Sequence, residues 1–154
     1  MPNSAHHDTI SHRRWVLVAH QAGARFFESK HKNHVELIEQ IDYPNGRLKH
    51  SELKSDKQGR GFDSMGGQRH HLGSMTDAPE HEATVFAQQL ADKLDLGRKE
   101  NHFNEVVLIA DPYFLGKLRD VLSSELSKIV VGSHSKDYAH TPMNELKERI
   151  LALL

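Results

Sequence analysis

Residues 105–132 constrain the fold more than any other part of the chain. They begin with an apolar, β-branched run at 105–110 (EVVLIA), which is typical of a buried strand. Asp111 and Pro112 then predict the start of a helix, and residues 128–132 (KIVVG) predict a further short strand. Two strands joined through a helix pair in parallel by a right-handed crossover, so this unit predicts an α/β fold.

Three more strands are predicted before this unit. Residues 15–20 (WVLVAH) form a short apolar run, a turn follows, and residues 24–29 (ARFFES) have the features of a hairpin partner. Residues 34–42 (HVELIEQID) alternate between apolar and polar, although Ile38 breaks the alternation, and predict a third strand that faces solvent on one side. The short connections favour antiparallel pairing of these strands.

Three amphipathic helices are predicted as well. Asp77 has the features of an N-cap, because Pro79 lies in the first turn and Glu80 has the spacing of a capping box, and Gly97 is expected to end this helix. Apolar residues recur at helical spacing in all three. In the first helix they are Ala83, Phe86, Ala87, Leu90 and Leu94, in the second Leu115, Leu118, Leu122 and Leu126, and in the third Met143, Leu146, Ile150 and Leu154.

The order of the elements is therefore β-β-β-α-β-α-β-α. This order predicts a mixed five-stranded sheet with helices packed on its faces, and 154 residues suffice for one such domain. We expect a disordered leader at residues 1–13 and a single domain at residues 14–154.

The composition excludes several classes of protein. The longest apolar runs fall far short of the roughly 20 residues that cross a bilayer, and the leader lacks the apolar segment of a secretory signal. The absence of cysteine excludes disulfides and thiolate metal sites. The net charge is −1, so no global positive charge indicates nucleic acid, although basic residues exceed acidic ones in the first half. We expect a cytoplasmic protein without a membrane partner.

Residues 43–76 lose all periodicity. This segment holds most of the chain's ten glycines and more basic than acidic residues. A stretch of this length without secondary structure is uncommon inside a compact domain and is usually functional or disordered. We therefore predict a long, mobile, Gly-rich loop before the first helix, and this loop is the candidate site.

The loop contains a Gly-Gly-Gln tripeptide between basic residues. Gly66 and Gly67 allow the backbone to approach another surface closely, because no Cβ intervenes. Gln68 offers an amide that can orient a water or stabilise an oxyanion. Arg60 and Arg69 can hold phosphates in bidentate fashion. These residue types together indicate contact with a phosphate-rich partner.

Four stretches resemble the bacterial proteins described as required for attachment to host cells. They are WVLVAHQAGARFFE near the start, GRGFDSMGGQRHH in the loop, FAQQLADKL in the first helix and VVLIADPYFLGKLRDVL in the next strand and helix. The resemblance covers residues 14–153. That family is regarded as a bacterial relative of the archaeal and eukaryotic class I release factors, whose middle domain carries a Gly-Gly-Gln loop between an antiparallel strand and the first helix.

The resemblance implies a ribonuclease H-like, three-layer α/β domain and an activity. In the release factors the Gly-Gly-Gln loop enters the ribosomal peptidyl transferase centre and promotes hydrolysis of peptidyl-tRNA. For this chain the resemblance implies binding to the ribosome or tRNA, and hydrolysis in ribosome rescue, since no codon-reading domain is apparent; no cofactor is implied. The implied catalytic residues are Gly66, Gly67 and Gln68, and the implied RNA-binding residues are Arg60, Gly61, Arg69, His70 and His71.

Three alternatives stay open. One is a non-catalytic module that binds a protein partner in stress response or host attachment. The second is a ribonuclease H-like nuclease, which needs several carboxylates around two magnesium ions. His20 ends the first strand, where those enzymes have Asp, and Asp111 follows the fourth strand but is also the predicted helix cap. The third is a metal site among the 13 histidines, but their spacing matches no zinc motif, so no metal is expected.

Overall fold

The computed structural model describes residues 13–47 and 68–154, and for residues 68–77 it describes the backbone alone. Five strands and five helical segments make up this part of the chain. The strands are β1 (Arg14–His20), β2 (Gly23–Ser29), β3 (Glu36–Asp42), β4 (Glu105–Ala110) and β5 (Val130–Ser135). The helical segments are η1 (Pro44–Arg47), α3 (Gln68–Lys99), α4 (Pro112–Val121), α5 (Ser124–Ile129) and α6 (Met143–Leu153).

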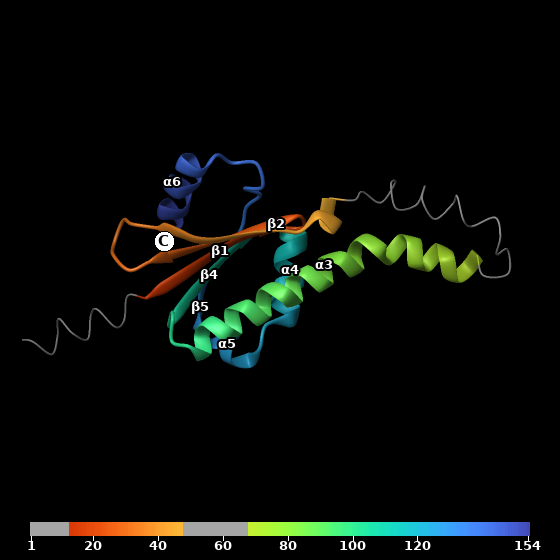
Figure 1. The fold of residues 1–154 in the computed structure, drawn as a ribbon, viewed down its shortest axis with the longest axis horizontal. Helices are drawn as coiled ribbons and strands as arrows, with labels where there is room; N and C mark the ends of the chain where they lie inside the picture. Colours follow the sequence, from red (N-terminus) through yellow and green to blue (C-terminus); the bar gives the residue numbers. More distant parts are fainter. Residues whose placement is uncertain (1–12, 48–67) are drawn as a thin grey trace, which may run out of the picture.

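The strands form one mixed sheet in the order β3-β2-β1-β4-β5. The hairpin strands β1, β2 and β3 pair in antiparallel fashion. β4 pairs in parallel with β1 on one side and with β5 on the other. Helices α3, α4 and α5 cover one face of this sheet and α6 covers the opposite face (Figure 1). The predicted α/β class, the five-stranded mixed sheet and the three layers are confirmed.

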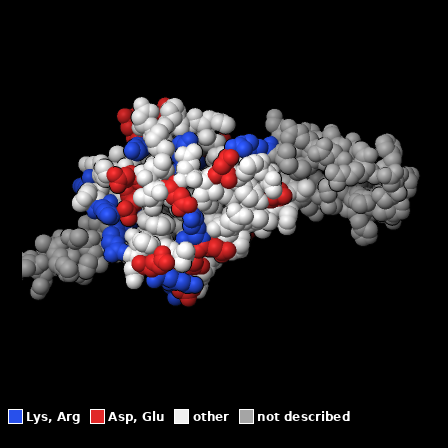
Figure 2. Space-filling view, viewed as in Figure 1, with Lys and Arg blue, Asp and Glu red and all other residues white. Residues whose placement is uncertain are grey.

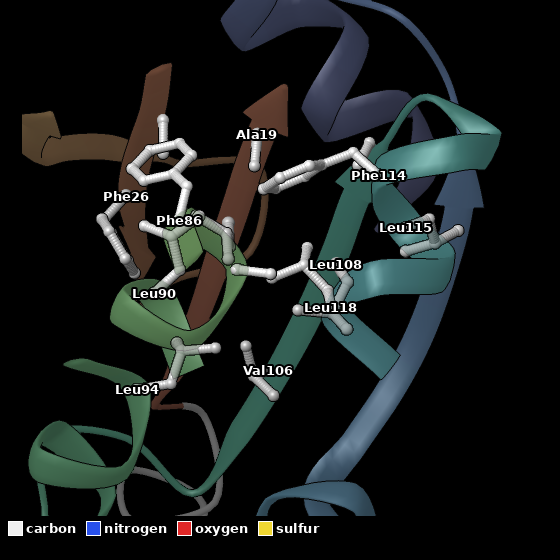
Figure 3. Packing of buried hydrophobic residues seen from close by; sticks show 14 of the residues in the cluster. Ala19, Phe26, Phe86, Leu90, Leu94, Val106, Leu108, Phe114, Leu115 and Leu118 are labelled. Carbon is white, nitrogen blue, oxygen red and sulfur yellow. The ribbon is translucent and has the colours of Figure 1, made fainter. Parts of the chain in front are cut away.

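The apolar core has two parts, one on each face of the sheet. Successive side chains of β1 alternate between them, so Leu17 packs under α3 and α4 while Val16 packs under α6. On the first face, Phe86, Leu90 and Leu94 of α3 point toward the strands and toward α4 (Figure 3). The five apolar residues predicted for this helix are all buried, which confirms the predicted stripe.

A β-bulge in β3 explains the break in alternation at Ile38. Phe26 pairs with Glu39 and Phe27 pairs with Leu37, so Ile38 is an extra residue in the ladder, and its side chain is exposed. Leu37 therefore packs on the α6 face, whereas Ile41 packs on the α3 face. The prediction that β3 presents one apolar face is wrong, because the bulge switches the sides.

Helix α3 begins earlier than predicted. It starts at Gln68, nine residues before the predicted cap Asp77, and Pro79 lies inside it. Proline is most common in the first turn, where its missing N–H has no partner to lose, which is why its position suggested a helix start. The predicted loop at residues 43–76 is correspondingly shorter: η1 occupies its first residues and α3 its last.

The predicted second helix is two helices. α4 ends at Val121, Leu122 is extended, and the Ser123 side chain accepts a hydrogen bond from the Leu126 N–H at 3.1 Å to begin α5. The serine cap signal overrides the continuous leucine spacing that predicted one helix. The strand that follows begins at Val130, two residues after its predicted start.

Two predictions concern residues that the structure does not describe. Of the disordered leader predicted at residues 1–13, residues 1–12 lie outside the described residues, and so do residues 48–67 of the mobile loop predicted at residues 43–76. Within residues 13–47 and 68–154, no helix is both long enough and apolar enough to cross a membrane.

Candidate functional site

The predicted site residues fall into two groups. Gln68, Arg69, His70 and His71 form the first turn of α3, where the backbone alone is described. The other four, Arg60, Gly61, Gly66 and Gly67, lie outside the described residues. The helical start nonetheless fixes one relationship, because it makes Gln68 the first residue of a helix that directly follows the two glycines.

Helix α3 is anchored by its carboxyl-terminal half. The first of its described side chains to be buried is Ala83, and the buried stripe continues to Leu94. Fifteen residues separate Gln68 from Ala83, which is ~22 Å at 1.5 Å per residue. Figure 1 shows α3 continuing past the sheet in this direction. The amino-terminal end of the helix therefore projects from the body of the domain.

Tyr43 connects the end of β3 to the anchored part of α3. Its hydroxyl donates a hydrogen bond of 2.6 Å to the Glu82 carboxylate, and its ring stacks on Phe86 with centroids 4.5 Å apart. Burial and the Glu82 carboxylate raise the pKa of Tyr43 to about 12, because both disfavour the phenolate. This contact holds β3, from which the chain continues toward the Gly-Gly-Gln segment, against the helix that follows that segment.

The η1 turn packs tightly against the β1–β2 hairpin. The Tyr43 N–H donates to the Ala22 carbonyl at 2.9 Å. A Cβ at Gly46 would collide with the Gln21 backbone, so only glycine fits there. The chain therefore leaves the described part at Arg47 from a fixed position at this end of the sheet.

The sequence of the first turn of α3 is basic. It contains no acidic residue, whereas Arg69 lies within it beside His70 and His71. The amino end of a helix already carries a partial positive charge from its unpaired N–H groups. A basic sequence at this end does not complement the helix dipole, but it does suit an anionic partner.

A pocket of about 510 Å³ lies at the same end of the sheet, on the face that α6 covers. Its polar side chains come from five separate elements and connections, a pattern that spacing along the chain does not reveal. They are His20 of β1, Arg25 of β2, Gln40 and Asp42 of β3, Arg47 of η1 and His140 of the β5–α6 connection. Of these residues, the sequence singles out His20 alone, because it lies at the end of the first predicted strand.

His20 is the partly buried histidine of this pocket. Its Nδ1 accepts a hydrogen bond from the Ala22 N–H at 3.2 Å. Burial lowers the pKa of His20, and His140 and Arg25 act in the same direction, while the carboxylates of Asp137 and Asp111 oppose them. The neutral ring is favoured, and with Nδ1 accepting, its proton resides on Nε2.

Asp111 is a helix cap, as predicted. Its carboxylate accepts from the Phe114 N–H at 3.1 Å, and Pro112 begins α4. Within residues 13–47 and 78–154, no three His, Asp or Glu side chains are grouped to bind a metal ion. The described residues therefore provide no carboxylate cluster of the kind that two-metal nucleases use.

The surface visible in Figure 2 carries both signs of charge. Lys and Arg side chains intermingle with Asp and Glu over the described part of this face. Charged side chains of the described residues also form ion pairs, such as Lys93 with Glu39 at 2.9 Å and Lys117 with Glu80 at 2.8 Å. The described part of this face therefore offers no broad basic surface of the kind that binds nucleic acid nonspecifically.

Comparisons with known proteins agree with this geometry at the level of the fold. The family described as "Protein required for attachment to host cells" matches residues 15–150. No curated protein matches the chain. A solved structure described as "Archaeal protein" is 8% identical with a TM-score of 0.51, and the match covers 97% of this chain and 36% of that one. A crystal structure of an archaeal translation termination factor is 8% identical with a TM-score of 0.45, over 91% of this chain and 38% of that one. The chain thus spans well under half the length of either structure.

Proposed function

This chain belongs to the family of proteins required for attachment to host cells. We propose that this member of the family is an RNA-binding protein. The partner is the ribosome or tRNA, and the contact is made by residues 59–71. Arg60, Gly61, Arg69, His70 and His71 contact the RNA, and the Gly-Gly-Gln tripeptide carries the chemical step.

One observation carries this proposal: Gln68 is the first residue of α3, and the described contacts of α3 with the rest of the fold lie at Glu80, Glu82 and the buried stripe that starts at Ala83. A tripeptide at the amino end of such a helix can enter a narrow RNA-lined space while the sheet stays outside. The basic first turn supports the same conclusion, because its charge and its helical N–H groups both favour phosphate.

The reaction that suits this arrangement is hydrolysis of the peptidyl-tRNA ester. The oxygen of a water forms a bond with the ester carbonyl carbon, the bond from that carbon to the ribose oxygen breaks, and a proton passes to the ribose oxygen. Gln68 orients the water through its amide, and Gly66 and Gly67 allow the backbone to approach the ester.

Ribosome co-sedimentation tests the binding step. The wild-type protein should pellet with ribosomes, and the bound fraction should fall with rising salt, as phosphate contacts require. Arg60→Ala combined with Arg69→Ala should weaken binding, whereas Arg119→Ala, which removes one positive charge from an exposed residue of α4, is a control that should bind as wild type does. Equal binding by the double variant and the control would contradict the proposal.

Peptidyl-tRNA cleavage tests the chemical step separately. Gln68→Ala should bind ribosomes as wild type does but release peptide at least about tenfold more slowly, the size of effect expected when one positioned group is lost. Equal release rates for wild type and Gln68→Ala would remove Gln68 from the mechanism while leaving RNA binding in place.

The second candidate is a non-catalytic module that binds a protein partner. The description of the family, which concerns attachment to host cells, favours it. A pull-down from cells that recovers one protein in stoichiometric amount and no ribosomes would support this candidate against the first.

A further inference from the structure

The pocket beside the β1–β2 turn has the features of an anion site. Its lining includes Arg25 and Arg47 but one carboxylate, Asp42, which pairs with Arg47. Two arginines and one carboxylate give this lining a net positive charge before any contribution from its histidines. Pockets of a few hundred Å³ with a few convergent polar groups are typical of small-molecule sites.

Arg25 is the cation best placed to hold a ligand. It stands on β2 opposite Val18 of β1 and Gln40 of β3, on the face where α6 packs. One guanidinium nitrogen donates to the Thr141 carbonyl at 3.2 Å, which orients the group. Among the residues that the structure describes, no carboxylate forms an ion pair with Arg25, so its other donors remain available for an anion.

His20 adds a neutral donor next to this arginine. Its Nδ1 is engaged by the Ala22 N–H, so the neutral ring offers the Nε2 proton. The ring lies against Gly23, since a Cβ built there would be 3.4 Å from His20 Nε2. Glycine at this position keeps the floor of the pocket open beside the donor.

The remaining wall is suited to an organic group. Val18, Tyr138 and Ala139 contribute apolar surface, and His140 lies at the rim as an exposed side chain. A bare inorganic ion would leave this surface uncovered, whereas a molecule with a phosphate and a ring system would contact both parts.

We propose that this pocket binds a small phosphate monoester of mononucleotide size, with the phosphate held by Arg25 and His20 and the organic group against Val18 and Tyr138. The proposal uses none of residues 59–71 and is independent of the proposed contact with the ribosome. The same phosphate chemistry occurs on a free nucleotide and on the 5′ end of an RNA chain.

Calorimetric titration tests the proposal with adenosine 5′-monophosphate as the probe. The wild-type protein should bind one equivalent with a Kd below about 1 mM, and adenosine, which lacks the phosphate, should bind at least about tenfold more weakly. A 5′-phosphorylated tetranucleotide distinguishes the two sources: tighter binding than the mononucleotide points to RNA ends, and weaker binding points to a free nucleotide.

Three variants assign the binding to this pocket. Arg25→Gln should weaken binding about tenfold or more, because a charge-assisted contact is lost. Arg47→Gln, at an exposed residue whose loss does not threaten the fold, should also weaken binding, because Asp42 is left unpaired in the pocket. Arg119→Gln removes the same charge from the surface of α4 and should bind as wild type does.

Saturation that depends on Arg25 and Arg47 but not on Arg119 supports the proposal. It is overturned if the folded wild-type protein shows no saturable binding of adenosine 5′-monophosphate or of the tetranucleotide at concentrations up to about 10 mM, because a Kd above that concentration is too weak for a built site. It is also overturned if adenosine binds as well as its monophosphate, or if the three variants bind alike.

Discussion

The Tyr43 hydroxyl and the Glu82 carboxylate are joined by a hydrogen bond of 2.6 Å, across a separation of 39 positions in the chain. Tyr43 directly follows β3 and Glu82 lies on α3. The bond therefore joins two residues that lie before and after the Gly-Gly-Gln tripeptide in the chain. The orientation of α3 relative to the sheet, and thus the direction in which Gln68 is presented, depends in part on this contact.

Removing this hydroxyl should lower stability without disturbing the stacked rings. Tyr43→Phe keeps the ring on Phe86 and loses one hydrogen bond to a charged acceptor, so the free energy of unfolding should fall by about 1–2 kcal/mol. Urea denaturation monitored by circular dichroism measures the change. A variant as stable as wild type would show that solvent replaces the bond at no cost.

The same contact predicts an alkaline transition. The pKa of Tyr43 in the folded protein, about 12, lies above its ordinary value of 10.0. The stabilisation is therefore complete below pH 10 and is lost as the pH rises toward 12. Ultraviolet titration of the phenolate should show an absorbance step near pH 12 that Tyr43→Phe removes, and Glu82→Gln should move this step to lower pH.

Gly97 and Gly116 form a matched pair of helical glycines. A Cβ at Gly97 would lie 2.9 Å from both Phe103 and Trp15, whereas a Cβ at Gly116 would meet nothing within 4 Å. Gly97→Ala should destabilise the protein by about 1–3 kcal/mol through overpacking. Gly116→Ala should stabilise it by up to about 1 kcal/mol through helix propensity. Chemical denaturation of both variants should give changes of opposite sign, and equal changes would contradict the packing described around Gly97.

Leu90 and Leu96 allow the same substitution to be compared on one helix. Leu90 is 0% exposed on the core face of α3 and Leu96 is 56% exposed. Leu90→Ala should cost about 2–5 kcal/mol of unfolding free energy, and Leu96→Ala should stay within about 0.5 kcal/mol. A large loss at Leu96 in dilute solution would indicate that this side chain is covered by a partner or by another copy.

Asp111 should behave as a cap and not as a metal ligand. Asp111→Ala removes the acceptor for the Phe114 N–H and should cost about 0.5–2 kcal/mol, whereas Asp111→Asn keeps an acceptor and should cost much less. Thermal unfolding with and without Mg²⁺ provides the second readout. An increase in Tm with Mg²⁺ that Asp111→Asn abolishes would restore the nuclease alternative.

Much of the architecture could be predicted because it depends on local periodicity. The stripe from Ala83 to Leu94 lies on one side of any helix with 3.6 residues per turn, and it is buried as predicted. Leu122 shows the limit of this reasoning: it fits the leucine spacing, but the Ser123 cap starts a new helix after it. Local capping therefore outweighed apolar spacing at that point.

Features that depend on distant contacts could not be predicted from spacing. Gly97 predicts the end of a helix, yet α3 continues to Lys99. Glycine is needed at this position because a Cβ would collide with the rings of Trp15 and Phe103. The pocket likewise gathers His20, Arg25 and His140, which come together only when the hairpin and the segment before α6 are in place. The roles predicted for residues 59–71 stay predictions, since the described side chains do not include them.

The central position of β1 has a consequence for synthesis of the protein. Arg14 of β1 is bonded to Glu105 of β4, and these residues are 91 positions apart. The β1–β2–β3 meander can form early in translation, but its inner edge stays unpaired until β4 has emerged, and its second apolar face stays uncovered until α6 has emerged. Pausing of translation between β3 and β4 should therefore be the period when the nascent chain is most prone to aggregate and most dependent on chaperones.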